Sequence, residues 1–524
     1  MPENTITIGI GSEFVSQSKP HKIKCGACRE KDFKKVIIEN SVSIIGREAF
    51  RDCRHLVSIE IPSSVLIIET GAFDGCIALT SVTISGGLKT IGPGAFRNCG
   101  KLATAVLSKG VEEIGAGAFK GCSSLASVTI PDSVKKIGER AFCDCTGLNE
   151  LEIPVGVTEI REQTFFGCTG LTSIRIPDEV KSIGGHAFRD CITLTSIRIP
   201  AGLREIEEFA FCGCTGLTSI DIPHGVTKID ASVFAGCTNL TSVSLPDSVY
   251  AIGNSVFKGC SQLKSVKIPN RVETVPDNAF EDCAKLTSMK IPDNVKEIGR
   301  YSFKNCAGLT SIELPDGMTQ IGEGAFLYCS NLRSVRIPAS VKWISPKAFM
   351  GCSCLASIMI PSKIEFINDH IFALCSNLTS VTIPQGVKAI GTGAFSHCPS
   401  LKALELPVSV NWIDEYAFGD SAGLISIIIP RSVKQIGKWA FADCTSLETV
   451  VIRYGVKGIG DKAFSNCTNL SVVSLPKSIT RIGTEVFDGC SSQMKLIWGS
   501  KQSCGNDSRQ HLTQEPRHER KSKR

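Results

Sequence analysis

Phenylalanine recurs every 23 residues along this chain, from Phe50 to Phe487. A cysteine follows each of these phenylalanines by three residues, except at Ser421, and an isoleucine precedes each by five residues, except at Val275. From Phe73 onward, a leucine also lies 17 residues before each phenylalanine. A fixed period of about 20 to 50 residues is the signature of a repeat architecture. We therefore expect one continuous array, although 524 residues would otherwise suggest roughly three or four globular domains.

Each unit begins with a segment that alternates in polarity. In LTSIRIP, residues 171–177, Ile174 and Ile176 have the two-residue spacing of a strand that buries one face. Pro177 has no backbone N–H and ends this strand. The pattern predicts one short strand in every 23 residues, with alternate side chains in the core and in solvent.

The second half of the unit combines a short extended piece with a turn. Val180 and Ile183 follow the proline and form the second extended segment. GHAFRDC, residues 185–191, is expected to form about one helical turn, which places Phe188 and Cys191 on the same face because they are three residues apart. One such coil holds too few apolar side chains to offset the entropy lost in ordering it, so it needs neighbouring coils.

Stacked coils meet this need by pairing their strands and aligning identical side chains. The expected fold is a repeat solenoid, a superhelix of about 20 coils with short parallel β-strands on one face and one-turn helical or extended segments on the other. The regular pattern covers residues 33–498. Residues 1–32 are expected to form an N-terminal segment and cap, and residues 499–524 a disordered basic tail.

The shared unit is L-x-S-V-x-I-P-x-x-V-x-x-I-G-x-x-A-F-x-x-C, completed by two variable residues. It resembles the 23-residue leucine-rich repeat of the BspA-like family, also called the Treponema-type repeat. The resemblance covers about residues 33–498, with Ser421 in place of cysteine and Ser85, Ser108 and Arg453 in place of proline. It implies a leucine-rich-repeat superhelix with an adhesive or partner-binding role, often at cell surfaces.

Most of the 25 cysteines belong to the repeat and are expected to be buried free thiols. Identical positions on parallel coils direct their side chains the same way, which disfavours disulfides between neighbours. The sequence Cys25-Gly-Ala-Cys28, with His21 ahead of it, has the spacing of half a zinc site or of a redox motif. No second pair lies nearby to complete four zinc ligands. We expect a polar cap without metal, and a zinc or redox protein remains a further alternative.

No group of residues predicts an active site. IGAGAFKG, residues 114–121, is the repeat's own Ile-Gly-x-x-Ala-Phe with an added glycine, and no Lys-Ser/Thr follows it as a phosphate-binding loop requires. The eight histidines occupy unrelated positions of the repeat. Neither a His-Glu-x-x-His motif nor a Gly-x-Ser-x-Gly motif between a strand and a helix is found. We therefore expect a protein that is not an enzyme and that binds no cofactor.

The distribution of charge limits the partners. Of the formal charge of +6, residues 501–524 contribute +4, because they hold seven Lys or Arg and three acids. The near-neutral body, with 6% aromatic residues, disfavours nucleic-acid binding. No apolar run reaches about 18 residues, so no transmembrane segment is expected. The start lacks a basic and apolar leader, which favours a cytoplasmic location, whereas translation from upstream of Met1 would favour the cell surface or secretion.

Outward positions that vary between coils are where a partner would bind. The position 13 residues before each phenylalanine faces outward on the strand and varies in charge. It holds Arg175 and Arg198 on consecutive coils, and Lys267 and Lys290 on another consecutive pair. These cations predict a basic track that would contact an acidic protein or, less favourably, a glycan.

A second candidate surface is apolar. Ile428 and Val451 occupy the same outward position on consecutive coils, and Val472 lies beside them one coil further along. Contiguous exposed apolar side chains mark interaction sites. The expected function is a non-enzymatic protein–protein interaction scaffold that binds through the exposed strand face. The first alternative is a secreted or cell-surface adhesin or antigen of the BspA-like type.

Overall fold

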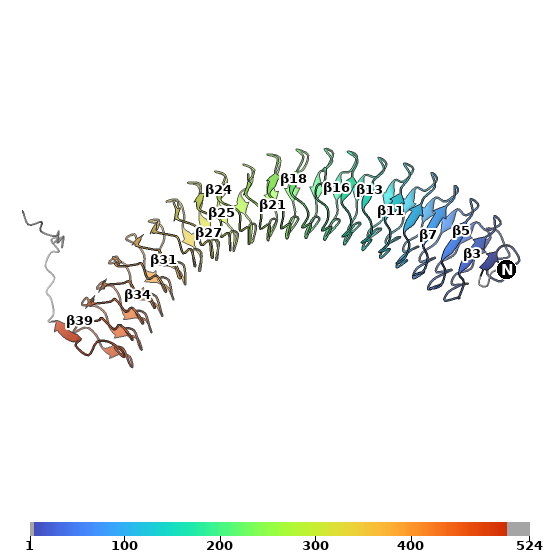
Figure 1. Cartoon of the computed structure of the whole chain (residues 1–524). Helices are drawn as coiled ribbons and strands as arrows, with labels where there is room; N and C mark the ends of the chain where they lie inside the picture. Colours follow the sequence, from blue (N-terminus) through green and yellow to red (C-terminus); the bar gives the residue numbers. More distant parts are fainter. Residues whose placement is uncertain (1–4, 500–524) are drawn as a thin grey trace, which may run out of the picture.

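The computed structural model describes residues 5–499, which form one continuous arch of stacked coils (Figure 1). The chain makes about 21 turns, and two rows of parallel strands run along the stack. The prediction of a parallel-strand solenoid is therefore confirmed. Within residues 5–499 there is no helix at all, and so none of a length and apolarity that would cross a membrane. The predicted basic tail lies, from residue 500 onward, outside the described residues.

The first strand row is formed by the alternating segment that ends at the proline. These strands form because isoleucine, valine and serine alternate, so that every second side chain enters the core. The members are β1 Thr5–Ile8, β3 Lys35–Ile38, β5 Ser58–Ile61, β7 Ser81–Ile84, β9 Thr104–Val106, β11 Ser127–Thr129, β13 Glu150–Glu152, β15 Ser173–Arg175, β18 Ser219–Asp221, β20 Ser242–Ser244, β22 Ser265–Val266, β24 Ser288–Lys290, β26 Ser311–Glu313, β28 Ser334–Val335, β30 Ser357–Met359, β32 Ser380–Thr382, β35 Ser426–Ile429, β37 Thr449–Ile452, β39 Val472–Pro476 and β41 Lys495–Gly499.

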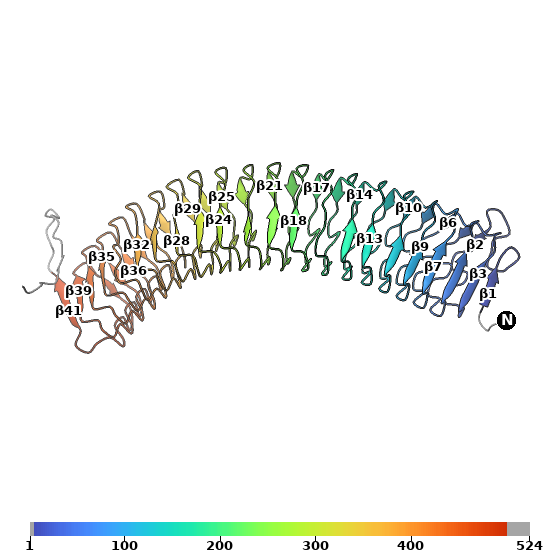
Figure 2. The ribbon, with the colours of Figure 1, turned by 45° about the horizontal axis from the view of Figure 1, so that its top comes forward.

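The second strand row consists of two-residue strands that end at the isoleucine five residues before each phenylalanine, except that β23 ends at Val275 and β2 ends five residues before Cys28. Figure 2 shows this row above the first one. The members are β2 Lys22–Ile23, β4 Ile44–Ile45, β6 Ile67–Ile68, β8 Thr90–Ile91, β10 Glu113–Ile114, β12 Lys136–Ile137, β14 Glu159–Ile160, β16 Ser182–Ile183, β17 Glu205–Ile206, β19 Lys228–Ile229, β21 Ala251–Ile252, β23 Thr274–Val275, β25 Glu297–Ile298, β27 Gln320–Ile321, β29 Trp343–Ile344, β31 Phe366–Ile367, β33 Ala389–Ile390, β34 Trp412–Ile413, β36 Gln435–Ile436, β38 Gly458–Ile459 and β40 Arg481–Ile482.

Neighbouring strands of the regular coils pair in parallel and 23 residues apart, so that Ser219 lies opposite Ser242. This register places the same repeat position side by side on consecutive coils. The first row is nevertheless not one continuous ladder, because hydrogen bonding between its strands is interrupted after β11, β15, β22, β28 and β32. Residues 194–200 form no strand, although Ile197 and Ile199 remain buried there.

The segment around each phenylalanine is a pair of tight turns, and the expected helical turn is wrong. His186 and Asp190, two residues before and two after Phe188, have φ angles of 57° and 61°, which lie in the left-handed region. Every regular coil repeats these two positive φ angles. The N–H of Phe188 therefore donates to Ala210 O on the next coil, at 2.8 Å, and not to a carbonyl four residues back. Bonds between coils replace bonds within a helix.

The core is a stack of identical side chains. Phenylalanine rings on consecutive coils lie nearly parallel, with centroids 5.0 Å apart at Phe418–Phe441 and 5.8 Å apart at Phe211–Phe234. From Cys76 onward, each repeat cysteine is a free thiol whose Sγ donates to a phenylalanine carbonyl, for example Cys191 to Phe165 O at 3.2 Å, whereas Cys53 donates to Cys28 O at 2.9 Å. The prediction of buried free thiols is confirmed for the ladder positions from Cys53 to Cys467, and Cys490 at the last coil is half-buried.

Ser421 occupies the one ladder position without cysteine. Its Oγ donates to Phe395 O at 2.6 Å and accepts a hydrogen bond from Cys398 N at 3.3 Å. The hydroxyl thus makes the bond that a thiol makes in the other coils, and it is fully buried. Because a buried hydroxyl is tolerated when it is hydrogen-bonded, the ladder continues through this coil.

Residues 5–32 form an additional, irregular coil on the N-terminal end. β1 pairs with β3, and β2 pairs with β4. Cys28 continues the phenylalanine column, since its N–H donates to Ala49 O at 2.8 Å just as Phe50 N–H donates to Ala72 O at 2.7 Å. Val15, Ile23 and Cys28 of this segment are buried against the first regular coils.

Candidate functional site

The outward side chains of the first strand row form the candidate binding face. In β15, Ser173 and Arg175 are exposed while Ile174 between them is buried. Most strands of this row repeat this order, so serine and the variable residue 13 before phenylalanine form two exposed columns. Because the serine side chain is short, the longer side chains of the variable column project furthest from the strand face and are the more accessible to a partner. Sequence alternation alone places both columns correctly.

The four predicted cations lie in this variable column as two pairs of neighbours. The coils of Asp221 and Ser244 separate the two pairs. Three of the four cations form exposed ion pairs with acids of the preceding coil: Arg175–Glu152 at 2.9 Å, Arg198–Asp178 at 3.0 Å and Lys267–Asp247 at 3.5 Å. No ion pair joins Lys290 to another residue within 5–499, and it is exposed at the end of β24. These acids reduce the positive potential of the basic track.

The predicted apolar patch is only partly exposed. Ile428 is 52% exposed and lies directly opposite Val451, which is half-buried. Val472 is also half-buried and lies opposite Thr449, so it is diagonal to Val451. The same column continues through Ser474 to Ile497, which is 52% exposed and which the sequence pattern had not included.

A cleft of about 840 Å³ opens on the first strand row at the first interruption of its ladder. Side chains of β11, β13 and β15 line it. Its charged residues are Asp132, Glu150, Glu152 and Arg175, so the predicted Arg175 lies at a hollow of the surface. Glu150 stands where most coils have serine, as the sequence already shows. The interruption between β11 and β13 leaves no such signal.

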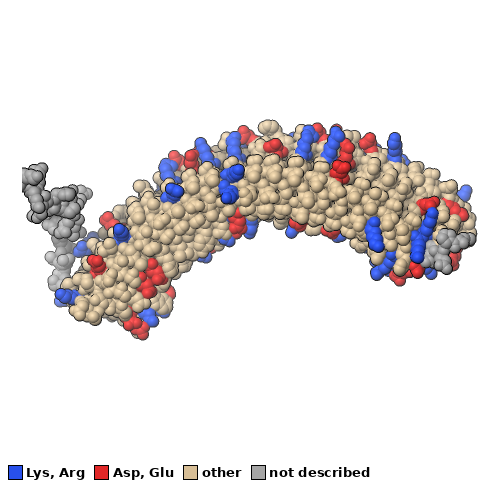
Figure 3. Space-filling view, in the orientation of Figure 1, with Lys and Arg blue, Asp and Glu red and all other residues tan. Residues whose placement is uncertain are grey.

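Charged side chains of both signs are interspersed along the upper edge of the arch, as Figure 3 shows. The broad surface below that edge is mostly uncharged in this view. Interspersed charges produce no extended field of one sign, which a nucleic-acid-binding surface requires. The distribution favours a partner that matches local pairs of charges.

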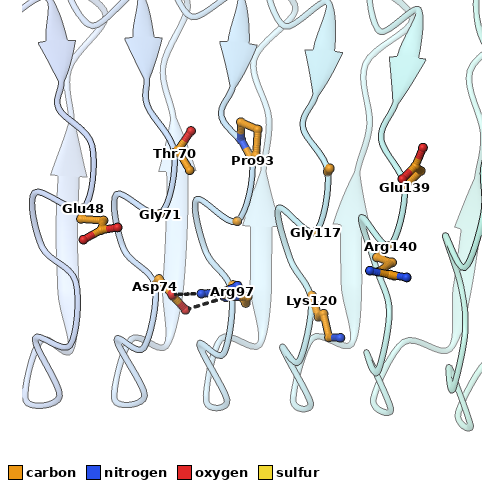
Figure 4. A pocket seen from close by; sticks show the side chains of 12 residues that line it. Glu48, Thr70, Gly71, Asp74, Pro93, Arg97, Gly117, Lys120, Glu139 and Arg140 are labelled. Carbon is orange, nitrogen blue, oxygen red and sulfur yellow. Dashed lines mark hydrogen bonds and ion pairs between the residues drawn. The ribbon is translucent and has the colours of Figure 1, made fainter.

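A second hollow, of about 310 Å³, was not predicted (Figure 4). It exists because three consecutive coils have glycine two residues before phenylalanine, namely Gly71, Gly94 and Gly117. Their φ angles of 59° to 63° suit glycine, and the missing side chains leave a trough. Glu48 and Arg140 stand at its two ends (Figure 4). The run of three glycines in one column was a signal that sequence reasoning could have used.

The charges in this trough are largely satisfied by one another. Asp74 is buried and lies beneath Arg97, whose Nε and Nη2 donate to its two carboxylate oxygens at 3.1 and 2.5 Å. The hydrogen bond that Arg97 donates to Asp74 raises the pKa of the Arg97 guanidinium. Arg140 pairs with Glu162 at 3.6 Å. A trough whose buried carboxylate is already paired holds the coils together and offers little to a ligand.

The column one residue after phenylalanine contains a similar bridge at Glu281. Its carboxylate is buried and accepts hydrogen bonds from Lys258 and Lys304, both at 2.9 Å, and from Asn278 at 2.6 Å. Burial opposes ionisation of Glu281, but the bonds from Lys304, Lys258 and Asn278 outweigh it and hold its pKa below the ordinary value. One carboxylate thus joins three consecutive coils.

Replacing Glu281 by glutamine is expected to lower the free energy of unfolding by about 1 to 3 kcal/mol at neutral pH, because two lysines lose their shared anion. Since the folded-state pKa is depressed, the stabilisation is present above the unfolded pKa and is lost as the pH falls through the folded one. Urea unfolding of both proteins at several pH values measures this. A difference between them that stays constant into the acid range would contradict the assignment.

A third hollow, of about 490 Å³, lies on the second strand row between β29 and β31, where that ladder is also interrupted. Trp343 and Phe366 line it and are 43% and 41% exposed. Lys342, Lys363 and Glu365 surround them. Both aromatics stand in a column that is polar or aliphatic in most coils, and this would have been visible in the sequence.

The N-terminal cysteine pair does not have the arrangement of a metal or redox site. Cys25 is exposed, whereas Cys28 is fully buried in the core. Burial raises the pKa of the Cys28 thiol to about 12, opposite to the depressed value that a reactive thiolate needs. Within residues 5–499 no three His, Cys, Asp or Glu side chains group as metal ligands would. Cys28 is therefore a core residue.

Comparison with known proteins supports the repeat assignment. A family model described as a BspA-type leucine-rich repeat region of six copies matches residues 21–149, 135–264, 251–379 and 365–494. Together these overlapping segments cover nearly all of the described coils. No curated protein matches the chain.

Several solved structures are similar. A leucine-rich repeat protein from Bacteroides ovatus is 29% identical, with 80% of this chain and 92% of that protein covered and a TM-score of 0.53. The leucine-rich repeat protein of T. pallidum is 29% identical and covers 35% of this chain and 77% of its own, with a TM-score of 0.27. A leucine-rich cell surface protein of Faecalibacterium prausnitzii, 22% identical with a TM-score of 0.29, covers 92% of this chain and 88% of its own.

Proposed function

Because this chain belongs to the BspA-type leucine-rich repeat family, we propose that it is a non-enzymatic scaffold that binds a protein partner through the first strand row. The cleft around Arg175 is the observation that carries this proposal. This cleft of about 840 Å³ lies on a face whose outward residues change from coil to coil while the inward residues stay the same. Variation on an accessible face above a constant core allows such a face to be specific for one partner.

The face suits a partner with both acidic and basic groups. Asp132 and Glu150 line the cleft, and Arg175 stands beside them with Glu152 as its neighbour. A protein surface that presents a cation to the acids and a carboxylate to Arg175 would replace the exposed ion pair with two intermolecular ones. Exposed ion pairs contribute little to stability, so their exchange costs the scaffold little.

The test is a charge reversal on this face with a matched reversal elsewhere. Changing Arg175, Arg198, Lys267 and Lys290 to glutamate should weaken capture of the protein partner on the order of tenfold or more, because like charges would face each other. The matched control changes four exposed cations that precede strands of the second row. They are Lys181, Arg204, Lys296 and Lys434.

Affinity capture from the source cells, quantified by mass spectrometry, compares the two variants with the natural chain. The proposal requires partners that the first variant loses and the control keeps. If the first variant retains every partner, or if both variants lose the same ones, binding does not use the first strand row and the proposal is wrong. Circular dichroism of each variant verifies that the fold is intact.

A further inference from the structure

The two ends of the core differ in how they are covered. At the C-terminal end, Ile482, Leu496 and Trp498 are 47%, 45% and 53% exposed. Residues one coil earlier in the same columns, Ile459, Val473 and Leu475, are at most 1% exposed. These C-terminal side chains occupy core columns, and among residues 5–499 no further coil covers them. Phe487, the last ring of the ladder, is only half-buried.

At the N-terminal end the core is closed. Val15, Ile23 and Cys28 belong to the irregular first coil and are at most 1% exposed. The ring of Phe14 packs edge-on against Phe33, with centroids 6.4 Å apart. A solenoid needs polar capping at its ends to stay soluble, and only the N-terminal end has such a cap among the described residues.

The last strand adds an open hydrogen-bonding edge to this apolar end. β41 is five residues long and pairs in parallel with β39 along its whole length. No strand within residues 5–499 pairs with its other side. Ile497, 52% exposed, points outward from the middle of this edge. An exposed and apolar edge strand is a template for pairing with another strand.

We infer that this end is a self-association surface, on which a second copy of the chain docks tail to tail about a two-fold axis, with the two β41 strands antiparallel. Pairing centred on Ile497 sets Leu496 opposite Trp498 of the second copy on the core side. It sets Lys495 opposite Gly499 of the second copy, so the two lysines do not face each other. Strand β41 is thus complementary to itself in this register.

Two other occupants fit less well. Residues 500–524 follow β41 directly, but Leu512 is their one large aliphatic residue and they contain no aromatic one, so they offer few side chains for an apolar surface. Docking of this end on the N-terminal end of another copy would meet the closed cap, and repeating it would build an open filament. A second identical end offers both an unpaired strand and exposed core columns.

The surface is small, so the association is expected to be weak. About half of each of four large side chains is exposed, which amounts to on the order of 400 Å². Two such surfaces fall near or below the low end of stable interfaces, which bury about 1,200 to 2,000 Å² in total. We expect a dimer that dissociates at micromolar concentration. It would join two arches and present two copies of the first strand row to multivalent partners.

Sedimentation equilibrium of the full chain tests this between about 1 and 200 µM. The natural chain should change from the monomer mass of 56.1 kDa to twice that value. The double variant Ile497→Lys/Trp498→Lys should stay monomeric at all concentrations. The matched control is Ile428→Lys, at an equally exposed isoleucine of the same column in β35, which should dimerise as the natural chain does. Circular dichroism and thermal unfolding verify that each variant is folded.

The following results would each contradict the inference. A natural chain that stays monomeric over the whole range excludes self-association. If the double variant still dimerises, the dimer forms through a surface other than β41. If the mass rises above that of a dimer, the copies stack in an open array. If the natural chain is monomeric but Leu512→Lys dimerises, residues 500–524 are the occupant. As an independent readout, Ile497→Cys should form a disulfide-linked dimer under mild oxidation, and Ile428→Cys should not, because only Ile497 faces its own copy across the axis.

Discussion

Replacing Phe257 by alanine is expected to lower the free energy of unfolding by about 3 to 5 kcal/mol. Phe257 is fully buried, and its ring stacks between Phe234 and Phe280 with centroid distances of 5.7 and 5.5 Å. Alanine would remove contacts to both neighbouring rings and leave a cavity that rigidly bonded coils cannot close. Urea unfolding monitored by circular dichroism measures the loss.

Phe487 provides the matched control for this substitution. It is the same residue at the same repeat position, but it is half-buried and stacks on one ring only, Phe464, at 5.8 Å. Phe487→Ala should cost about half as much, since less area leaves water and no enclosed cavity forms. Equal losses for Phe257→Ala and Phe487→Ala would show that stacking between coils does not hold the array together.

A deletion of one whole period is expected to be tolerated, whereas a deletion of half a period is not. Removing residues 212–234 joins Phe211 to Ala235 and so restores the sequence Phe-Ala-Gly-Cys of a normal coil. Each coil contacts only its neighbours, so the shortened chain should fold into an arch with one coil fewer. Its far-UV circular dichroism per residue should match that of the natural chain, with a single cooperative transition.

Removing residues 212–222 is the contrasting case. This deletion takes Cys214, Leu217 and Ile220 out of one coil, together with the whole of β18. The remaining half coil cannot continue either strand row in register, so the two flanking arrays lose their contact and should unfold in separate transitions. Limited proteolysis should cut at the junction of this variant only. A single transition like that of the natural chain would contradict nearest-neighbour stacking.

The buried residues of each coil could be predicted because the same apolar residues recur at the same positions in every repeat. Leucine, isoleucine, phenylalanine and cysteine recur at fixed spacing, and each environment is created by identical residues above and below. The expectation failed at Phe188, where spacing alone fitted a helical turn. The repeat spacing does not show that His186 and Asp190 have left-handed φ angles. These angles direct the backbone hydrogen bonds to the next coil.

The outward columns of the candidate binding face were predictable, but its shape was not. Alternation placed Arg175 and Ile428 outward, yet it could not show that Glu152 pairs with Arg175. Nor could it show the interruption between β11 and β13, which opens the cleft. Both features depend on how the side chains and backbones of neighbouring coils are placed in three dimensions, which the repeat pattern does not specify.

The sequence by itself determined that this chain is a solenoid, because a coil too small to have its own core becomes stable only against a copy of itself. It also determined which residues are buried, since every ladder position recurs with the period. Only the tertiary structure decided where the ladders open, which charges are paired and which end of the core is covered. Those properties arise where coils differ or where the stack stops, and at these places the repeat no longer supplies an identical neighbour.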